Sequence, residues 1–344
     1  MTIQTQLPLP AFFDPARVGE IWRVPYQTRA AQAREWAKKQ TIPLASQDSP
    51  SVCLLAIDVQ NTFCLPEFEL FVGGRSGMGA VEDTTRLCEF VYRNLGHITE
   101  IVPTLDTHTA VQIFHPAFWI DPNGQPPEPM TLIEWADVKS GQWRVNPNIA
   151  SGLDLDSAAL EQFVTHYAQR LSEDGKYPLT IWPYHSMIGG IGHALVPAFE
   201  EACFFHNRVR QRQTRFEIKG GNPLTENYSV LRPEVLDDPT GKPIAQKNRQ
   251  LIQHLLTFDA VIVAGQAKSH CVAWTVEDLL TEIQAIDPSL ARKVYLLEDC
   301  TSPVVVPGVV DFTDAANTAY QRFVSAGMTV IQSGQNVAEL LPHS

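Results

Sequence analysis

The stretch Val52-Cys-Leu-Leu-Ala-Ile-Asp58 is a continuous apolar run that ends in a carboxylate. Such a run is too short for a helix and is typical of a strand buried on both faces of a sheet. Six more short runs with a strand pattern follow, at residues 100–105, 179–182, 214–218, 260–264, 293–297 and 329–331. Together these runs predict a sheet built around buried strands.

Helical patterns separate most of these runs and indicate the fold class. They cover residues 81–95, 191–204, 247–256, 272–286 and 312–326. Strands that alternate with helices predict βαβ units. We therefore expect an α/β fold whose mainly parallel sheet is covered by helices on both faces.

Two stretches fall outside this alternation. Residues 1–50 are rich in Pro, Gln and Arg and end in a turn-forming cluster. They predict an N-terminal arm, with some helix at 30–39, before the main domain at 51–344. An insertion at about 116–177 contains several prolines and one clear helix, at 157–171. A long segment between two strands is typical of a lid or a binding loop.

Charge and cysteine usage restrict the partners. The 344-residue chain has a formal net charge of −12, and its densest basic stretch is Arg208–Arg215. An acidic protein repels phosphate backbones and anionic lipid, so we expect no nucleic-acid partner and no membrane partner. No run approaches the ~20 apolar residues of a membrane span. Six cysteines without CxxC spacing predict reduced thiols and a cytoplasmic protein.

Three polar residues that follow apolar runs carry the candidate chemistry: Asp58, Lys219 and Cys271. Ligands of α/β sheets bind beyond the carboxyl ends of the strands. Cys271 stands where a loop enters a helix, a place that favours the thiolate. A thiol nucleophile, a carboxylate that moves its proton and a cation are what amide cleavage requires. Taken singly, each residue has a structural alternative. Cys271 could be a buried structural thiol, Asp58 a cap of the following loop and Lys219 a solvated turn lysine.

A second group has the side chains of a metal site. Asp106 and His108 are two positions apart, so in an extended segment both point to one side. His115 follows seven residues after His108, and His185 follows another apolar run. A carboxylate with two or three imidazoles suits Zn²⁺, Fe²⁺ or Mn²⁺. Four unrelated loop residues are the alternative interpretation.

In five of its motifs the chain resembles the nicotinamidase branch of the isochorismatase-like cysteine hydrolases. The matching motifs are Ala56-Ile-Asp58-Val-Gln-Asn61-Thr-Phe63, Asp106-Thr-His108, Trp182-Pro-Tyr-His185, Ile218-Lys219-Gly220 and Val263-Ala-Gly-Gln-Ala267-Lys-Ser-His-Cys271-Val272. They occur in the order found in the family. The resemblance implies a Rossmann-like three-layer αβα sandwich with a six-stranded sheet.

The resemblance also implies a role for each catalytic residue. Asp58 would take the proton of the Cys271 thiol and later pass it to the leaving ammonia. Lys219 would stabilise this charged pair. The backbone N–H groups of Ala267 and Cys271 would form the oxyanion hole, with an unusual loop geometry before Ala267.

For the ion and the substrate, the resemblance implies a single site. Asp106, His108 and His185 would hold one divalent ion, which would bind a pyridine nitrogen. The expected ion is Zn²⁺, with Fe²⁺ or Mn²⁺ as alternatives. His115 is a further candidate ligand, although it lies one residue off the spacing expected. Phe63 and Trp182 match the aromatic positions that flank the substrate ring.

The implied activity is a metal-dependent nicotinamidase, which converts nicotinamide and water to nicotinate and ammonia in NAD salvage. A hydrolase of another small amide, ureido or carbamoyl compound is the first alternative, and the retained aspartate and histidines favour the nicotinamidase over it. The second is a non-catalytic binding protein on the same scaffold, which would not need the three catalytic residues. The expected partner is a small-molecule amide, and a homo-oligomer remains open.

Overall fold

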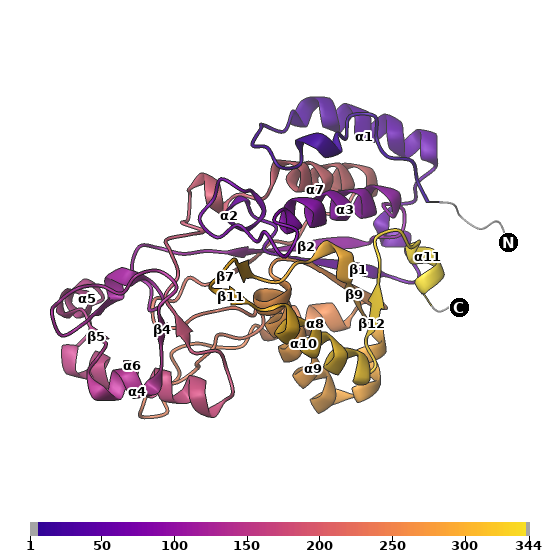
Figure 1. The fold of residues 1–344 in the computed structure, drawn as a ribbon. Helices are drawn as coiled ribbons and strands as arrows, with labels where there is room; N and C mark the ends of the chain where they lie inside the picture. Colours follow the sequence, from indigo (N-terminus) through magenta and orange to yellow (C-terminus); the bar gives the residue numbers. More distant parts are fainter. Residues whose placement is uncertain (1–5, 342–344) are drawn as a thin grey trace. The chain divides into compact units, whose positions relative to one another are not determined.

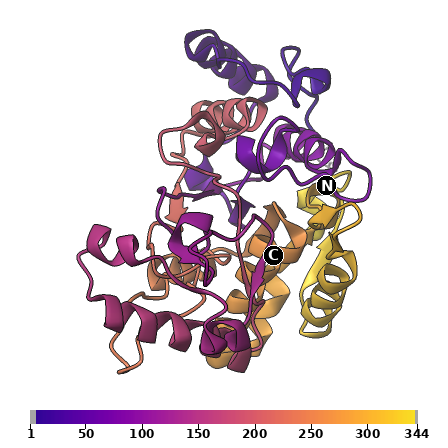
Figure 2. The same cartoon turned by 60° about the vertical axis from the view of Figure 1, so that its left-hand side comes forward.

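The computed structural model describes residues 6–341, which form two compact units (Figures 1 and 2). Unit 1 contains the described residues up to 105, together with 194–217 and the residues from 249 onward. Unit 2 contains residues 106–193 and 218–248. The chain therefore passes between the units several times.

The central sheet has six parallel strands in the order β12-β9-β8-β1-β2-β7. The strands are β1 (Val52–Ile57), β2 (Glu100–Asp106), β7 (Glu217–Lys219), β8 (Ala260–Gly265), β9 (Val294–Leu297) and β12 (Thr329–Ile331). All six residues of β1 are buried because strands flank it on both edges and helices cover both faces. The predicted α/β fold and parallel sheet are confirmed.

Helices cover both faces of this sheet (Figure 1), which gives the predicted three layers. On one face are α3 (Gly79–Arg93) and α7 (Pro197–Arg210), and on the other α8 (Arg249–Leu256), α9 (Ala273–Ile286) and α10 (Thr313–Ser325). Unit 1 also contains the short helices α2 (Asn61–Cys64) and α11 (Val337–Leu340) and the hairpin of β10 (Val305–Val306) and β11 (Val310–Asp311).

One predicted helix begins later than its sequence pattern. Residues 191–193 form a separate 3₁₀ turn, and α7 starts at Pro197. Proline has a fixed φ and no N–H, so it favours the first position of a helix. The apolar pattern of 191–204 therefore combined two elements.

The run at residues 179–182 was expected in the central sheet, and that prediction is wrong. Its β6 (Leu179–Thr180) pairs antiparallel with β4 (Leu132–Ile133) in a two-stranded sheet of unit 2. A four-residue apolar run carries no information about its partner strand. Here the partner comes from the insertion itself.

The insertion has more regular structure than its sequence predicted. Besides α6 (Ser157–Glu173), it contains α4 (Trp135–Ser140), α5 (Pro147–Gly152) and the paired strands β3 (Trp119–Ile120) and β5 (Arg144–Val145). Elements of two to six residues are too short to show a hydrophobic period. The lid role of this segment stays a prediction.

The described residues before β1 pack within unit 1, against α7. Helix α1 (Tyr26–Gln40) lies along α7 in both views (Figures 1 and 2). The ring of Phe12 lies 6.0 Å from that of Tyr92 and 5.1 Å from that of Phe205. No helix within residues 6–341 combines the length and the apolar character that a membrane span needs.

Arg210 links these first residues to α7, and its loss should destabilise the protein. The side chain is fully buried, pairs with Asp48 and donates a hydrogen bond of 2.5 Å to the carbonyl of Pro43. Removing one partner of a buried ion pair costs about 3–5 kcal/mol, because the other charge stays buried. We expect Arg210→Met to lower the free energy of unfolding in urea by that amount.

The control is Arg75→Met, because the Arg75–Asp311 pair is solvent-exposed. Exposed pairs contribute about 0–1 kcal/mol. Equal losses for the two variants would contradict a stabilising role for the buried pair.

Candidate functional site

Asp58 directly follows β1 and is completely buried. Its φ is 48°, which is uncommon for a residue other than glycine. Its N–H donates to the Thr104 hydroxyl at 3.0 Å, and that hydroxyl donates to Oδ1 of Asp58 at 2.5 Å. Thr104, on the neighbouring β2, therefore holds the Asp58 carboxylate in place. Residues in such an uncommon backbone conformation cluster at functional sites.

Cys271 lies in a π-helical turn, Lys268–Val272, at the entrance to α9. The N–H of Val272 donates to the carbonyl of Ala267 at 3.2 Å, and the peptide bond before Ala267 is cis. π-Helical turns are rare in proteins overall, but they occur frequently at functional sites. The amino end of a helix also favours a thiolate over a thiol.

Asp58 and the turn of Cys271 lie at the same edge of the sheet within unit 1. Strands β1 and β8 are parallel neighbours, and Ile57 is paired with Gly265. Asp58 follows the first strand, and Gln266 and Ala267 follow the second. The structure thus brings together the carboxylate and the thiol-bearing turn that the sequence predicted at two strand ends.

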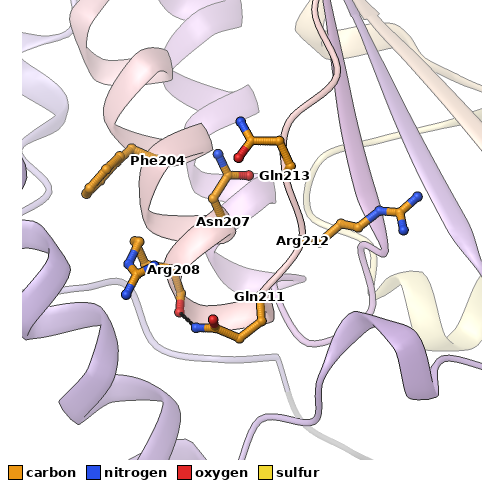
Figure 3. Close-up of a pocket in the computed structure, with 6 residues that line it drawn as sticks. All are labelled: Phe204, Asn207, Arg208, Gln211, Arg212 and Gln213. Atoms are coloured by element: carbon orange, nitrogen blue, oxygen red, sulfur yellow. Dashed lines mark hydrogen bonds between the residues drawn. The ribbon is translucent and has the colours of Figure 1, made fainter.

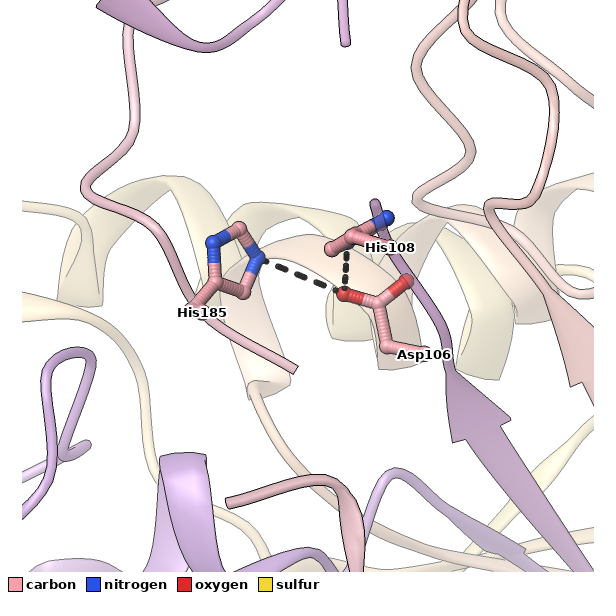
Figure 4. Close-up of side chains that lie close together, drawn as sticks. All are labelled: Asp106, His108 and His185. Atoms are coloured by element: carbon pink, nitrogen blue, oxygen red, sulfur yellow. Dashed lines mark hydrogen bonds and ion pairs between the residues drawn. The ribbon is translucent and has the colours of Figure 1, made fainter. Parts of the chain in front are cut away.

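Asp106, His108 and His185 form a buried cluster in unit 2 (Figure 4). One ligand atom of each lies within 4.8 Å of the others. Oδ2 of Asp106 is 2.7 Å from Nε2 of His108 and 3.4 Å from Nε2 of His185. Two imidazoles converging on one carboxylate oxygen are a donor set for a divalent metal.

The electrostatics of the cluster favour the metal-binding forms of Asp106 and His185. Burial would lower the pKa of His108, but the attraction of Asp106 outweighs the effect of burial and raises it. Burial would raise the pKa of Asp106, but His108 and Lys219 hold it well below its ordinary value. Burial lowers the pKa of His185, which favours the neutral imidazole. An ionised carboxylate and a neutral imidazole are the forms that bind metal.

His115 lies beside the cluster, and its ring centroid is 6.0 Å from those of His108 and His185. Nδ1 is 3.3 Å from the carbonyl of Ala110, while the buried Nε2 has no hydrogen-bond partner within residues 6–341. Burial, followed by the charges of His185 and His108, lowers its pKa to about 3. Its neutral ring would suit a further ligand, and that role stays a prediction.

Lys219 also belongs to unit 2. Its Nζ donates to Oδ1 of Asp106 at 2.8 Å and to the carbonyl of Asn227 at 2.9 Å. Asp58 and Cys271 belong to unit 1. The role of Lys219 toward those two residues stays a prediction.

The two predicted ring contacts, Phe63 and Trp182, are both nearly buried. Phe63 lies on α2 in unit 1, whereas Trp182 lies in unit 2. The indole Nε1 of Trp182 donates to the Tyr228 hydroxyl at 3.1 Å. Tyr228 thus orients a predicted contact residue, although no sequence motif singled it out. Ring binding by Phe63 and Trp182 stays a prediction.

Gly220 supports the metal cluster in a way that only glycine allows. Its φ is +84°, and an added Cβ would lie 2.6 Å from Cε1 of His108 and 2.9 Å from Oδ1 of Asp106. Its carbonyl is 3.1 Å from Nδ1 of His108. With a metal bound, this contact would favour the tautomer that carries its proton on Nδ1 and leaves Nε2 as the ligand.

We expect Gly220→Ala to weaken zinc binding by about 10–100-fold, the range for loss of the groups that orient metal ligands. The measurement is a competition titration of the metal-free protein with a zinc indicator. Gly221→Ala is the matched control, because none of the described residues has an atom within 4 Å of a Cβ there. Unchanged affinity in Gly220→Ala would contradict the close approach.

A hollow outside this region lies at the end of α7 (Figure 3). Its lining residues are Phe204, Asn207, Arg208, Gln211, Arg212 and Gln213. Arg212 is paired with Glu100, and the carboxyl end of a helix carries partial negative charge. This hollow contains none of the predicted site residues, and we do not include it in the candidate site.

Comparisons with solved structures agree with the fold. The chain matches yeast nicotinamidase Pnc1p bound to nicotinaldehyde at 17% identity and a TM-score of 0.50, over 82% of this chain and 99% of that one. It also matches a nicotinamidase/pyrazinamidase of Acinetobacter baumanii at 20% identity, a TM-score of 0.49 and 86% and 100% coverage. No protein-family model and no curated protein matches the chain. At these identities the likeness shows the fold alone.

Proposed function

We propose that this protein is an amidohydrolase that cleaves a small carboxamide through a thioester on Cys271, with nicotinamide as its substrate. The observation that carries this proposal is the convergence of the buried Asp58 and the Cys271 turn at the ends of adjacent parallel strands. The fold shared with yeast nicotinamidase and the five sequence motifs support it.

The residues of the chain account for each bond that changes. Asp58 accepts the thiol proton, and Sγ of Cys271 attacks the amide carbon while backbone N–H groups of Ala267 and Cys271 stabilise the oxyanion. The C–N bond then breaks, and Asp58 returns the proton to the nitrogen, which leaves as ammonia. Water hydrolyses the thioester, giving the carboxylic acid and the free thiol.

The buried cluster fits a divalent ion by its donor chemistry and by Nε2 of His115, which has no hydrogen-bond partner in the described part of the chain. Asp106, His108 and His185 would hold the ion, with His115 as a further ligand. Zn²⁺ suits this mixture of imidazole and carboxylate, and Fe²⁺ and Mn²⁺ are alternatives. When bound, the ion supplies a Lewis-acid position for a ring nitrogen of the substrate.

A screen of ammonia release tests the proposal. The purified protein would be given nicotinamide, pyrazinamide, carbamoyl amino acids and biuret, and its metal content would be measured. We expect the highest kcat/KM for the pyridine and pyrazine amides and about one metal ion per chain. A preference for ureido or carbamoyl compounds would indicate the alternative hydrolase, and no turnover of any amide would favour a binding protein.

Metal removal should affect amides with a ring nitrogen most. If the ion positions that nitrogen, chelation should raise KM for nicotinamide more than for an aliphatic amide. Steady-state kinetics before and after dialysis against a chelator, with zinc restored as a control, measure the difference. Full activity toward nicotinamide in the metal-free protein would contradict this role.

A further inference from the structure

Lys268 is the first residue of the π-helical turn that carries Cys271, and its side chain is buried in unit 1. Only 6% of the residue is exposed, which is rare for lysine unless its charge is paired. Nζ donates to Oε1 of Glu298 at 3.1 Å and to Oδ1 of Asn317 at 3.2 Å. It also lies 4.3 Å from the ring centroid of Tyr320. The ammonium is thus held on several sides.

These partners come from elements outside the turn. Glu298 directly follows β9, and Asn317 and Tyr320 lie on α10. The ammonium therefore connects the start of the turn to a strand end and to a helix. The linkage is charged and directional, so it fixes position more closely than apolar packing does.

The next two side chains of the turn are anchored as well. The Ser269 hydroxyl accepts a hydrogen bond of 3.0 Å from the N–H of Val304. The ring of His270 packs edge-to-face on that of Phe312, with 4.7 Å between centroids. Three consecutive side chains are thus held by the protein, immediately before the thiol.

We propose that Lys268 is a positioning residue for the nucleophile, holding the π-helical turn so that the Cys271 thiol and nearby backbone N–H groups meet the substrate carbonyl. This inference rests on the proposed function. A π-helical turn is a rare conformation beside the regular helix of α9. A shift of about 1 Å in a reacting group can reduce a rate about 100-fold.

The test compares Lys268→Met and Lys268→Arg in the full chain. Methionine keeps the apolar stem and removes the ammonium, and arginine keeps the charge. We expect Lys268→Met to lower kcat by about 10–100-fold with KM within about threefold, and Lys268→Arg to recover at least about tenfold. Alkylation of Cys271 by iodoacetamide, followed by peptide mass spectrometry across a pH series, should become slower and move to higher pH in Lys268→Met.

Lys176→Met is the matched control for a purely structural effect. Lys176 forms an ion pair of the same length, 3.1 Å, with Glu234 in unit 2, and this pair is more buried than that of Lys268 with Glu298. Lys176→Met should lower the midpoint of thermal unfolding, while the alkylation profile of Cys271 stays as in the wild type. The same shift in Lys176→Met, or wild-type kcat and alkylation in Lys268→Met, would overturn the proposal.

The test still decides if Lys268→Met does not fold or if the wild type cleaves no amide. If Lys268→Met does not fold, Asn317→Ala removes one acceptor and keeps the lysine, and we expect a smaller change in the same direction; an unchanged profile would count against the proposal. If the wild type cleaves no amide, the proposed function fails. The alkylation profiles then decide on Lys268 alone, because they need no substrate.

Discussion

Cys271→Ala should abolish amide hydrolysis, with a loss of at least about 10³-fold in kcat, while the protein stays folded. The reason is that alanine cannot form the thioester, so the two-step route through a covalent intermediate is lost. Cys271 lies at the turn before α9 and not inside a strand, so a smaller side chain disturbs little packing. The measurement is ammonia release under saturating substrate, together with urea unfolding.

Cys203→Ala is the control for this variant. Cys203 is buried on α7, and burial raises the pKa of its thiol, so it stays protonated and unreactive. We expect wild-type kcat in Cys203→Ala. Residual turnover above a few per cent in Cys271→Ala, in protein free of contaminating amidase, would remove the thiol from the mechanism.

Gly265→Ala should prevent folding or lower the free energy of unfolding by more than about 4 kcal/mol, the upper end for single substitutions. Its φ is +108°, and an added Cβ would lie 2.0 Å from the carbonyl oxygen of Ile57. The clash is with the backbone of β1, which cannot move without breaking its pairing with β8. Circular dichroism and urea unfolding of the soluble protein measure the effect.

Gly96→Ala provides the comparison, because no atom of residues 6–341 lies within 4 Å of a Cβ at that position. We expect its stability to change by less than about 1 kcal/mol. A folded Gly265→Ala protein with wild-type stability would show that the two strands are not paired as described.

The strands of the central sheet were predictable because burial on both faces leaves a strong sequence signal. The runs that became β1 and β8 are continuous and apolar, and both are fully buried. The run at 179–182 has the same character, yet it pairs within unit 2. Apolar character predicts that a segment is buried, whereas the choice of partner depends on contacts far along the chain.

The site could be predicted where a residue follows a strand, as Asp58 does. Thr104 could not, because its contact with Asp58 depends on how β1 and β2 are aligned. The closeness of Gly220 to His108 likewise depends on two loops that approach each other from distant parts of the chain. Functional side chains at strand ends can thus be predicted from the sequence, whereas the groups that orient them depend on tertiary contacts.

The pairing of β1 with β8 also bears on how the protein is made on the ribosome. Val52 pairs with Ala260, about two hundred residues later, so β1 leaves the ribosome long before this neighbour. At about 5–20 residues per second, that interval is roughly 10–40 s. During it an apolar strand has an unpaired edge, which is prone to aggregation. The strand order therefore favours slow folding and leaves this edge open to aggregation during synthesis.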